Sequence, residues 1–202
     1  MRHLASIAFV AAILCGCASG SRWTRQMFAF SLPPETTATN SNTNLVALRR
    51  VSISPLFQSR SFTYRTGEDS YEQDPYAGFL IPPEQAVAEA IRASMRASGV
   101  FGRLVPPGSD LAPSLIAAVS VTQLYGDLRN RSQPLGTMAI HFICYEVNDG
   151  VPGPIVLDKV CARETPMVAR TPDALMAAWD TDLRKIMEEI NSAYSKASST
   201  TH

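Results

Sequence analysis

The chain begins with a short apolar run that ends in a cysteine, and this run decides how much of the sequence is available to fold. Arg2 supplies a positive charge, residues 4–14 are apolar except for Ser6, and small residues surround Cys17. This order of charged, apolar and small-residue regions is typical of a secretory signal. The apolar run covers about 11 residues, whereas a membrane-spanning helix needs about 20. Residues 1–16 are therefore predicted to be a signal peptide that lies outside the folded domain.

The end of this run, Leu14-Cys15-Gly16-Cys17, resembles the lipobox of bacterial lipoproteins. In such signals the peptide is cut before the cysteine, and the cysteine thiol is acylated. We therefore expect a mature chain that starts at the lipidated Cys17 and is anchored to a membrane by its lipid. The residue after this cysteine is Ala18, not Asp. By the sorting behaviour common to such lipoproteins, this favours the outer membrane, and we expect the domain at its periplasmic face. An ordinary signal peptide and a buried apolar N-terminal helix are the alternatives.

Charge and length restrict the remaining sequence to few classes of protein. The full chain has 18 basic and 18 acidic residues, removing Arg2 with residues 1–16 leaves 17 against 18, and no cluster of Lys or Arg is present. Binding to nucleic acid is not expected, because it requires clustered cations that displace counterions. Removing residues 1–16 from 202 leaves 186, which fits one domain. We expect a lipidated tether at 17–26, a single periplasmic domain at 27–196 and a frayed tail at 197–202.

Apolar periodicity and turn residues predict six main strands and two main helices. The first helix follows Pro82-Pro83 and ends before Gly99, and the last begins at Thr171-Pro172-Asp173, where Thr171 can cap it. The apolar stripe predicted to be buried on the last helix comprises Leu175, Trp179, Leu183, Ile186 and Ile190. The predicted strands cover 27–32, 45–53, 61–65, 115–124, 137–147 and 155–164, with 70–73 as a return strand after 61–65.

The order strands, helix, strands, helix predicts an α+β fold. Its expected form is a mostly antiparallel sheet with two main helices packed on one face. The last three strands follow one another through turn-rich segments, which predicts an antiparallel meander.

Two cysteines remain in the predicted domain, Cys144 and Cys161. They lie on two strands joined by the turn-rich segment 148–153, and an oxidising compartment permits a disulfide between them. The alternative is a pair of buried, reduced cysteines that act as small hydrophobic residues. Zinc is not expected, because two cysteines with one nearby histidine provide too few ligands.

Catalytic patterns are scarce in this sequence. His141 is the only histidine of the predicted domain, and on a strand it is expected to be a hydrogen-bonded sheet residue rather than a base. No Gly-x-Ser-x-Gly, His-Glu-x-x-His or Gly-rich phosphate or dinucleotide loop is found. We therefore predict a protein that is not an enzyme, with no catalytic residues, no metal site and no cofactor.

One stretch before the first helix is unusually rich in aromatic residues. Tyrosine and arginine are favoured at interface centres because they combine a large, stiff contact area with polar tips. The stretch therefore predicts a partner-binding surface. The alternative is that the aromatic side chains pack beneath the first helix and that Arg65 pairs with Asp69 or Asp74. The residues assigned to the surface are Tyr64, Arg65, Tyr71, Tyr76 and Phe79.

The chain resembles the ABC-type transport auxiliary lipoprotein family, which includes the paraquat-inducible protein C-like lipoproteins. Members often have a tryptophan where this chain has Gly78-Phe79. The matching segments are the lipobox at Cys17, Phe28-Ala29-Phe30-Ser31-Leu32-Pro33, Val51-Ser52-Ile53, Phe62-Thr63-Tyr64-Arg65, residues 71–79, and Pro82 through Gly99-Val100-Phe101.

This resemblance implies a periplasmic α+β domain that serves an envelope transport system. The implied partners are an ABC transporter or an MCE-domain protein, and a homo-oligomer is possible because some relatives form rings. The expected function is a lipid-anchored auxiliary subunit for transport of lipids or hydrophobic solutes. The alternative is a lipoprotein that itself binds and carries a lipid or a small hydrophobic ligand.

Overall fold

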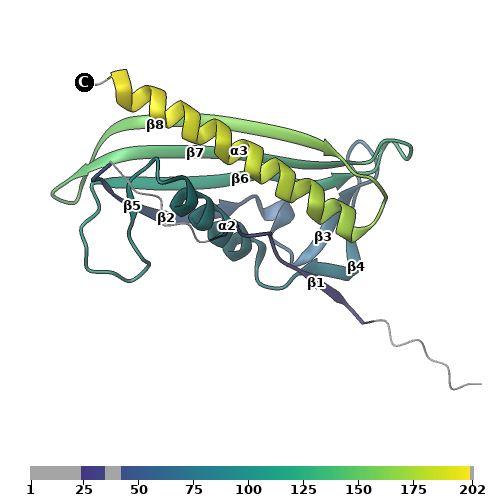
Figure 1. Ribbon diagram of the computed structural model, residues 1–202. Helices are drawn as coiled ribbons and strands as arrows, with labels where there is room; N and C mark the ends of the chain where they lie inside the picture. Colours follow the sequence, from purple (N-terminus) through teal and green to yellow (C-terminus); the bar gives the residue numbers. More distant parts are fainter. Residues whose placement is uncertain (1–23, 35–41, 201–202) are drawn as a thin grey trace, which may run out of the picture.

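The structure is a computed structural model that describes residues 24–34 and 42–200 (Figure 1). The predicted signal peptide, Cys17 and most of the tether lie outside the described residues. The strands are β1 (Gln26–Phe28), β2 (Leu45–Ile53), β3 (Ser61–Arg65), β4 (Tyr71–Phe79), β5 (Arg103–Leu104), β6 (Leu115–Asp127), β7 (Leu135–Asn148) and β8 (Val151–Pro166). The helices are the 3-10 turn η1 (Pro55–Phe57), α2 (Pro83–Ser98) and α3 (Pro172–Thr200).

All eight described strands join in one sheet that branches at β6. One edge of β6 pairs along its length with β7, and β8 continues the sheet beyond β7. The other edge pairs first with β2, through Val121, and then with β3 at Gly126 and Asp127. The chain leaves the sheet at η1 between these two strands. One long strand thereby connects a β2–β5 branch with a β3–β4–β1 branch.

The fold class is α+β as predicted, and the sheet is mixed. The predicted meander of β6, β7 and β8 is antiparallel, and so is the β3–β4 hairpin. The pairs β2–β6, β3–β6, β1–β4 and β2–β5 are parallel. Parallel neighbours require a long crossover, and the connection from β2 to β6 runs through β3, β4 and α2.

Both main helices begin and end near the residues that the sequence predicts. Gly99 has φ 63°, a left-handed conformation that costs glycine little, and its N–H bonds to the carbonyl of Met95. Thr171 caps α3, because its hydroxyl accepts the N–H of Ala174 at 3.3 Å. The sequence predicts a frayed tail at 197–202, but residues 197–200 still belong to α3.

The core lies between the sheet and the two helices, which pack on the same face (Figure 1). The predicted stripe of α3 is buried throughout. Trp179 is fully buried between Phe62 and Phe79 and donates its indole N–H to the carbonyl of Thr137 at 3.2 Å. α3 approaches β7 closely at Gly136, where a Cβ would lie only 2.6 Å from that of Ala178. This glycine therefore sets the distance between helix and sheet.

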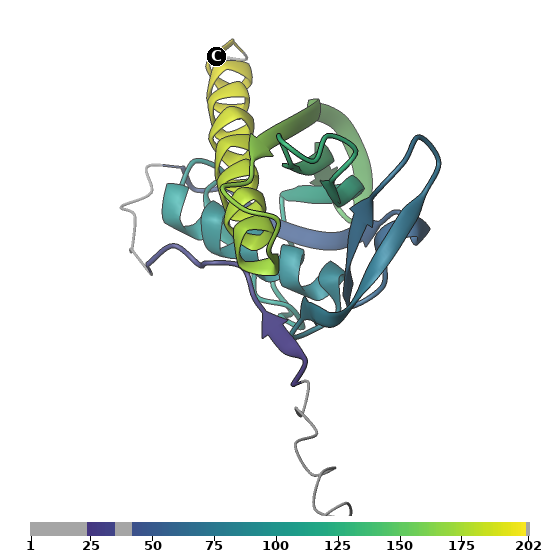
Figure 2. The same cartoon turned by 90° about the vertical axis from the view of Figure 1, so that its right-hand side faces the viewer.

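The two ends of the described chain lie at opposite ends of the molecule. β1 lies beside β4 at one end, and α3 runs to the other end, beside the turn between β7 and β8 (Figure 1). Viewed along the sheet from the β1 end, the β3–β4 hairpin projects on the side away from α3 (Figure 2). Among the described residues, no helix is long and apolar enough to cross a membrane.

Candidate functional site

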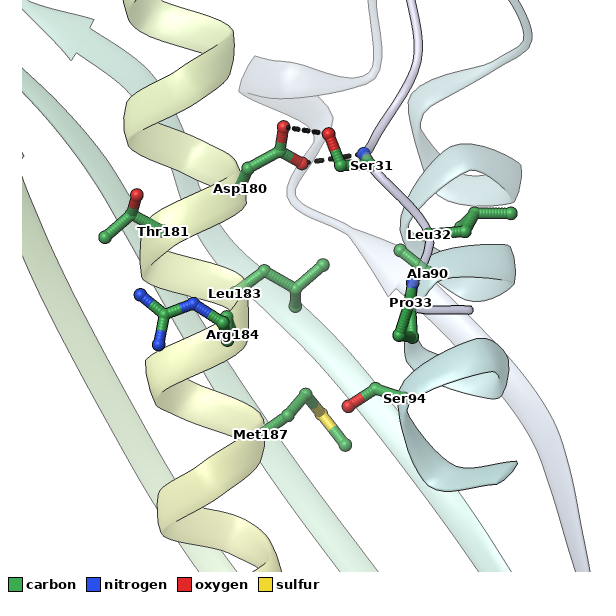
Figure 3. Close-up of a pocket in the computed structure, with 10 residues that line it drawn as sticks. All are labelled: Ser31, Leu32, Pro33, Ala90, Ser94, Asp180, Thr181, Leu183, Arg184 and Met187. Carbon is green, nitrogen blue, oxygen red and sulfur yellow. Dashed lines mark hydrogen bonds between the residues drawn. The ribbon is translucent and has the colours of Figure 1, made fainter. Parts of the chain in front are cut away.

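A groove of about 310 Å³ lies between α2, α3 and the segment that follows β1 (Figure 3). Ala90 of α2 and Leu183 and Met187 of α3 form its apolar walls, and Leu32 and Pro33 cross one side of it. The volume is at the lower end of the range for small-molecule sites, roughly 300–1,000 Å³. The groove is therefore large enough for a short alkyl group or a single apolar side chain.

Most polar groups around this groove are already used by the fold. Both carboxylate oxygens of Asp180 accept hydrogen bonds from Ser31, one from its N–H at 2.9 Å and one from its hydroxyl at 2.8 Å. Thr181 donates to the carbonyl of Ala177, and Arg184 pairs with Glu188 along α3. Figure 3 shows Thr181 and Arg184 pointing away from α2. The groove therefore offers apolar contacts and few free polar groups that could bind a ligand or take part in catalysis.

The predicted partner-binding residues do not form a single surface. Phe79 is 2% exposed and stacks on Trp179, so its assignment to the surface is wrong. It points inward because alternate residues of β4 face opposite sides of the sheet. The neighbouring Gly78 has no room for a side chain, since a Cβ there would lie 2.2 Å from the carbonyl oxygen of Arg60.

Tyr64 is half-buried on the hairpin and interacts with Asp74 of the neighbouring strand. Burial raises the pKa of its hydroxyl above the usual value, and the charge and hydrogen bonding of Asp74 raise it further. Its ring lies against Gly126, where a Cβ would approach the ring within 2.7 Å. Tyr64 is therefore a packing residue of the β3–β6 contact.

Arg65 and Tyr71 lie together at the tip of the hairpin. Arg65 donates to the carbonyls of Gly67 and Glu68 and pairs with the Glu68 side chain at 3.5 Å, so the pairing with Asp69 or Asp74 that was the alternative to a binding surface is wrong. Its guanidinium lies 6.0 Å from the ring centre of Tyr71, which itself packs on Phe57 and Tyr125. Tyr71 and Tyr76 remain exposed by 41% and 49%.

The sheet brings together a cluster of polar side chains that the sequence alone does not reveal. Ser120 and His141 are opposite each other in register, and His141 Nε2 lies 2.7 Å from Asp158 Oδ1. Ser52 donates to the Ser120 hydroxyl at 3.2 Å. The three residue types of a hydrolytic triad therefore meet on the sheet face opposite the helices. No sequence motif could have indicated this, because the residues come from three strands.

The Ser120–His141–Asp158 group lacks the hydrogen-bond donors that acyl transfer requires to stabilise an oxyanion. An oxyanion needs preorganised N–H donors near the nucleophile. At Ser120, β6 is paired on one edge with β2 and on the other with β7, so its backbone donors are used by the sheet. The geometry suits a hydrogen-bonded sheet residue, as expected for His141.

The predicted disulfide is wrong, because Cys144 and Cys161 are free and buried. Cys144 pairs with Leu157, and Cys161 pairs with Ile140, so the two cysteines are offset by four residues along the strands. At about 3.4 Å per residue this offset exceeds 13 Å, whereas a disulfide needs Cα atoms about 4.4–6.8 Å apart. Burial raises the pKa of Cys144 to about 12 and also raises that of Cys161.

Acidic and thiol side chains are dispersed over the fold. In the part of the chain that the structure describes, no group of three or more His, Cys, Asp or Glu residues could hold a metal ion. Asp127 instead pairs with Arg129 at 2.7 Å, and this hydrogen bonding lowers the pKa of the carboxyl. Glu189 pairs with Lys159 and Arg163, which joins α3 to β8.

Comparison with solved structures identifies proteins of the same fold. A Xanthomonas campestris protein assigned to the DUF330 family superimposes with a TM-score of 0.63 and 15% identity, over 88% of this chain and 96% of that one. The crystal structure of an uncharacterized protein superimposes with a TM-score of 0.65 and 12% identity, over 84% of this chain and 97% of that one. At these identities the similarity concerns the fold alone. No protein-family model and no curated protein matches the sequence.

Proposed function

We propose that this chain is an exported, lipid-anchored auxiliary subunit of an envelope transport system for lipids or hydrophobic solutes. The observation that carries the proposal is the position of Cys17, in a lipobox only seven residues before Thr24, where the described fold begins. The fold shared with the DUF330-family protein and the resemblance to the ABC-type transport auxiliary lipoproteins support it. The proposed partner is an ABC transporter or an MCE-domain protein.

The short tether keeps the domain close to its membrane. Seven residues span at most about 25 Å when fully extended. The end of the domain that carries β1 therefore lies near the bilayer. The 29 residues of α3 extend about 43 Å at 1.5 Å per residue, toward the opposite end. A protein placed in this way can present its outer end and flanks to other envelope components.

A role in protein contacts rather than catalysis is part of the proposal. Most polar groups of the groove between α2 and α3 are used internally, and the Ser120–His141–Asp158 group lacks free backbone donors. Loss of a measured hydrolytic activity on the change His141→Ala, with the fold retained, would overturn this part of the proposal.

Anchoring is tested by two cysteine variants of the lipobox. Cys17→Ala should release the domain from membranes into the soluble periplasmic fraction. Cys15→Ala is the matched control, because it changes the neighbouring cysteine of the signal and leaves the acylated position intact. Retention of the Cys17→Ala chain on membranes in high salt would overturn lipid anchoring.

The transport role is tested by cross-linking in intact cells followed by purification from detergent-solubilised membranes. We expect a permease, ATPase or MCE-domain protein to co-purify with the wild-type chain and to be lost with Cys17→Ala. Recovery of the chain without such a component would remove the main support for the role. Light scattering of the purified chain tests whether it forms the homo-oligomer that the resemblance implies.

The groove between α2 and α3 favours a second candidate, a carrier of a hydrophobic ligand. Its walls are apolar, and Ser94 is one of its lining residues, so a larger side chain at position 94 would fill the groove. Native mass spectrometry of chain purified without detergent should then show a stoichiometric hydrophobic ligand, such as a lipid with one alkyl end in the groove, and Ser94→Phe should displace it. A ligand-free wild-type mass would exclude this candidate.

A further inference from the structure

Three exposed apolar or aromatic residues lie at neighbouring positions of β1 and β4, where the chain joins the sheet. Met27 of β1 is opposite Gly78 of β4, and Tyr76 and Leu80 lie two residues to either side of that glycine. Gly78 itself is buried, and the carbonyl oxygen of Arg60 and the guanidinium of Arg25 occupy the space that a side chain there would take. Met27 is 40%, Tyr76 49% and Leu80 55% exposed. We call these three, with Arg25 and Arg60, the tether patch.

The two arginines border this apolar group. Arg25 donates to the Ser61 hydroxyl at 2.7 Å, and its guanidinium passes 2.8 Å from the position of a Cβ on Gly78, so it lies on the same outward face. Arg60 donates to the carbonyl of Leu80. β4 carries two carboxylates: Asp74 uses one oxygen to accept the N–H groups of Tyr76 and Ala77, and Glu72 lies farther along the strand, opposite Tyr64. The patch therefore combines exposed apolar area with two cations.

This composition matches the chemistry of a bilayer interface. Tyrosine is enriched at the level of the lipid headgroups, because its ring is apolar and its hydroxyl remains hydrated. Arginine lays its alkyl stem on apolar surface while the guanidinium stays in the polar layer. Apolar side chains next to cations are the usual means by which proteins lie on anionic bilayers.

We propose that the tether patch rests on the surface of the bilayer that holds the lipid anchor. The inference rests on the proposed lipidation of Cys17. The patch begins at Arg25, one residue after the point at which the described fold starts, and the seven preceding residues reach at most about 25 Å. It is therefore the part of the domain that the anchor holds nearest to the headgroups. Contact there fixes how the domain is oriented on the membrane.

The test measures depth with a polarity-sensitive fluorophore on a single introduced cysteine. The lipidated full chain carrying Leu80→Cys is labelled and reconstituted into vesicles of phosphatidylethanolamine and phosphatidylglycerol. Val151→Cys, at the turn between β7 and β8, is the matched control, since Val151 is 64% exposed and lies at the other end of the molecule (Figure 1). Cys144 and Cys161 are 0% and 2% exposed, and Cys17 is acylated, so the label reports one position.

We expect a blue shift and at least twofold quenching by a headgroup-linked nitroxide lipid at position 80, and no change at position 151. Tyr76→Cys provides a second site in the patch and should respond like position 80. Equal responses at positions 80 and 151, from chain that still floats with the vesicles, would overturn the patch and leave the anchor intact. Chain that does not float with the vesicles would overturn both.

Discussion

Ser31 donates two hydrogen bonds to Asp180, from its N–H at 2.9 Å and from its hydroxyl at 2.8 Å, although 149 residues separate them in sequence. The bonds attach the segment after β1 to the first third of α3, on one side of the groove between the helices (Figure 3). The N-terminal segment that follows the tether is thereby held against the longest helix of the fold.

The Ser31–Asp180 pair should contribute measurably to stability. Ser31→Ala removes one of the two bonds, and a typical intramolecular hydrogen bond contributes about 0.5–1.5 kcal/mol to stability. We expect a loss of about 1 kcal/mol in the free energy of unfolding, with a similar or larger loss for Asp180→Asn. Ser94→Ala, on the facing helix, is the control. Fully additive losses in the double variant would show that the two residues do not interact.

Asp182 should make the stability dependent on pH. Its side chain is 0% exposed, Thr165 donates to one oxygen at 2.6 Å, and burial raises its pKa to about 6 despite the nearby charges of Lys185 and Arg163. Because the folded-state pKa lies above the usual 3.8, the carboxyl stabilises the fold fully below pH 3.8. This contribution is lost as the pH rises through 6.

The variant that tests this is Asp182→Asn, which keeps an acceptor for Thr165 and removes the charge. The free energy of unfolding of this variant, taken relative to wild type, should rise by on the order of 2 kcal/mol from pH 4 to pH 8, since one pKa unit corresponds to about 1.4 kcal/mol. Urea unfolding at the two pH values measures the gain. A pH-independent effect of Asp182→Asn would contradict the assignment.

Trp179 should be among the most sensitive positions of the core. Trp179→Ala should cost about 3–5 kcal/mol, because it removes a fully buried ring that packs on Phe62 and Phe79. Trp179→Phe keeps most of the packing and loses the bond to the carbonyl of Thr137, so its cost should be smaller. Thermal melting compares the variants, and an unchanged curve for Trp179→Ala would show that the ring does not support the core.

Cys144 and Cys161 should both be free thiols in the mature protein. Titration in denaturant without reductant should detect two thiols per chain, with Cys17 acylated. Without denaturant their reaction should be slow, because both are buried and their pKa values are raised. Fewer than two thiols in denaturant would indicate a bridge, which the register of β7 and β8 does not allow.

Local sequence signals predicted several boundaries closely. The strands at 45–53 and 61–65 and the helix from Pro83 to Ser98 match the structure, and Thr171 caps α3 as expected. These features depend on residues within one turn or one strand of each other, which is the range over which periodicity and capping act. The turn between β7 and β8 was predicted over 148–153 but uses only Asp149 and Gly150, which both have positive φ, and β8 begins at Val151.

The sequence by itself carries the signal and lipobox pattern, and it determined the type of the main elements and the buried stripe of α3, although the short β5 was not predicted. Only the tertiary structure decided which strands are neighbours, and therefore which side chains meet. The branch at β6 makes the sheet mixed, the register offset keeps Cys144 and Cys161 apart, and the alternation of β4 buries Phe79 while it exposes Tyr76. Strand order and register arise from contacts between distant residues, and a shift of one residue reverses the face of every side chain.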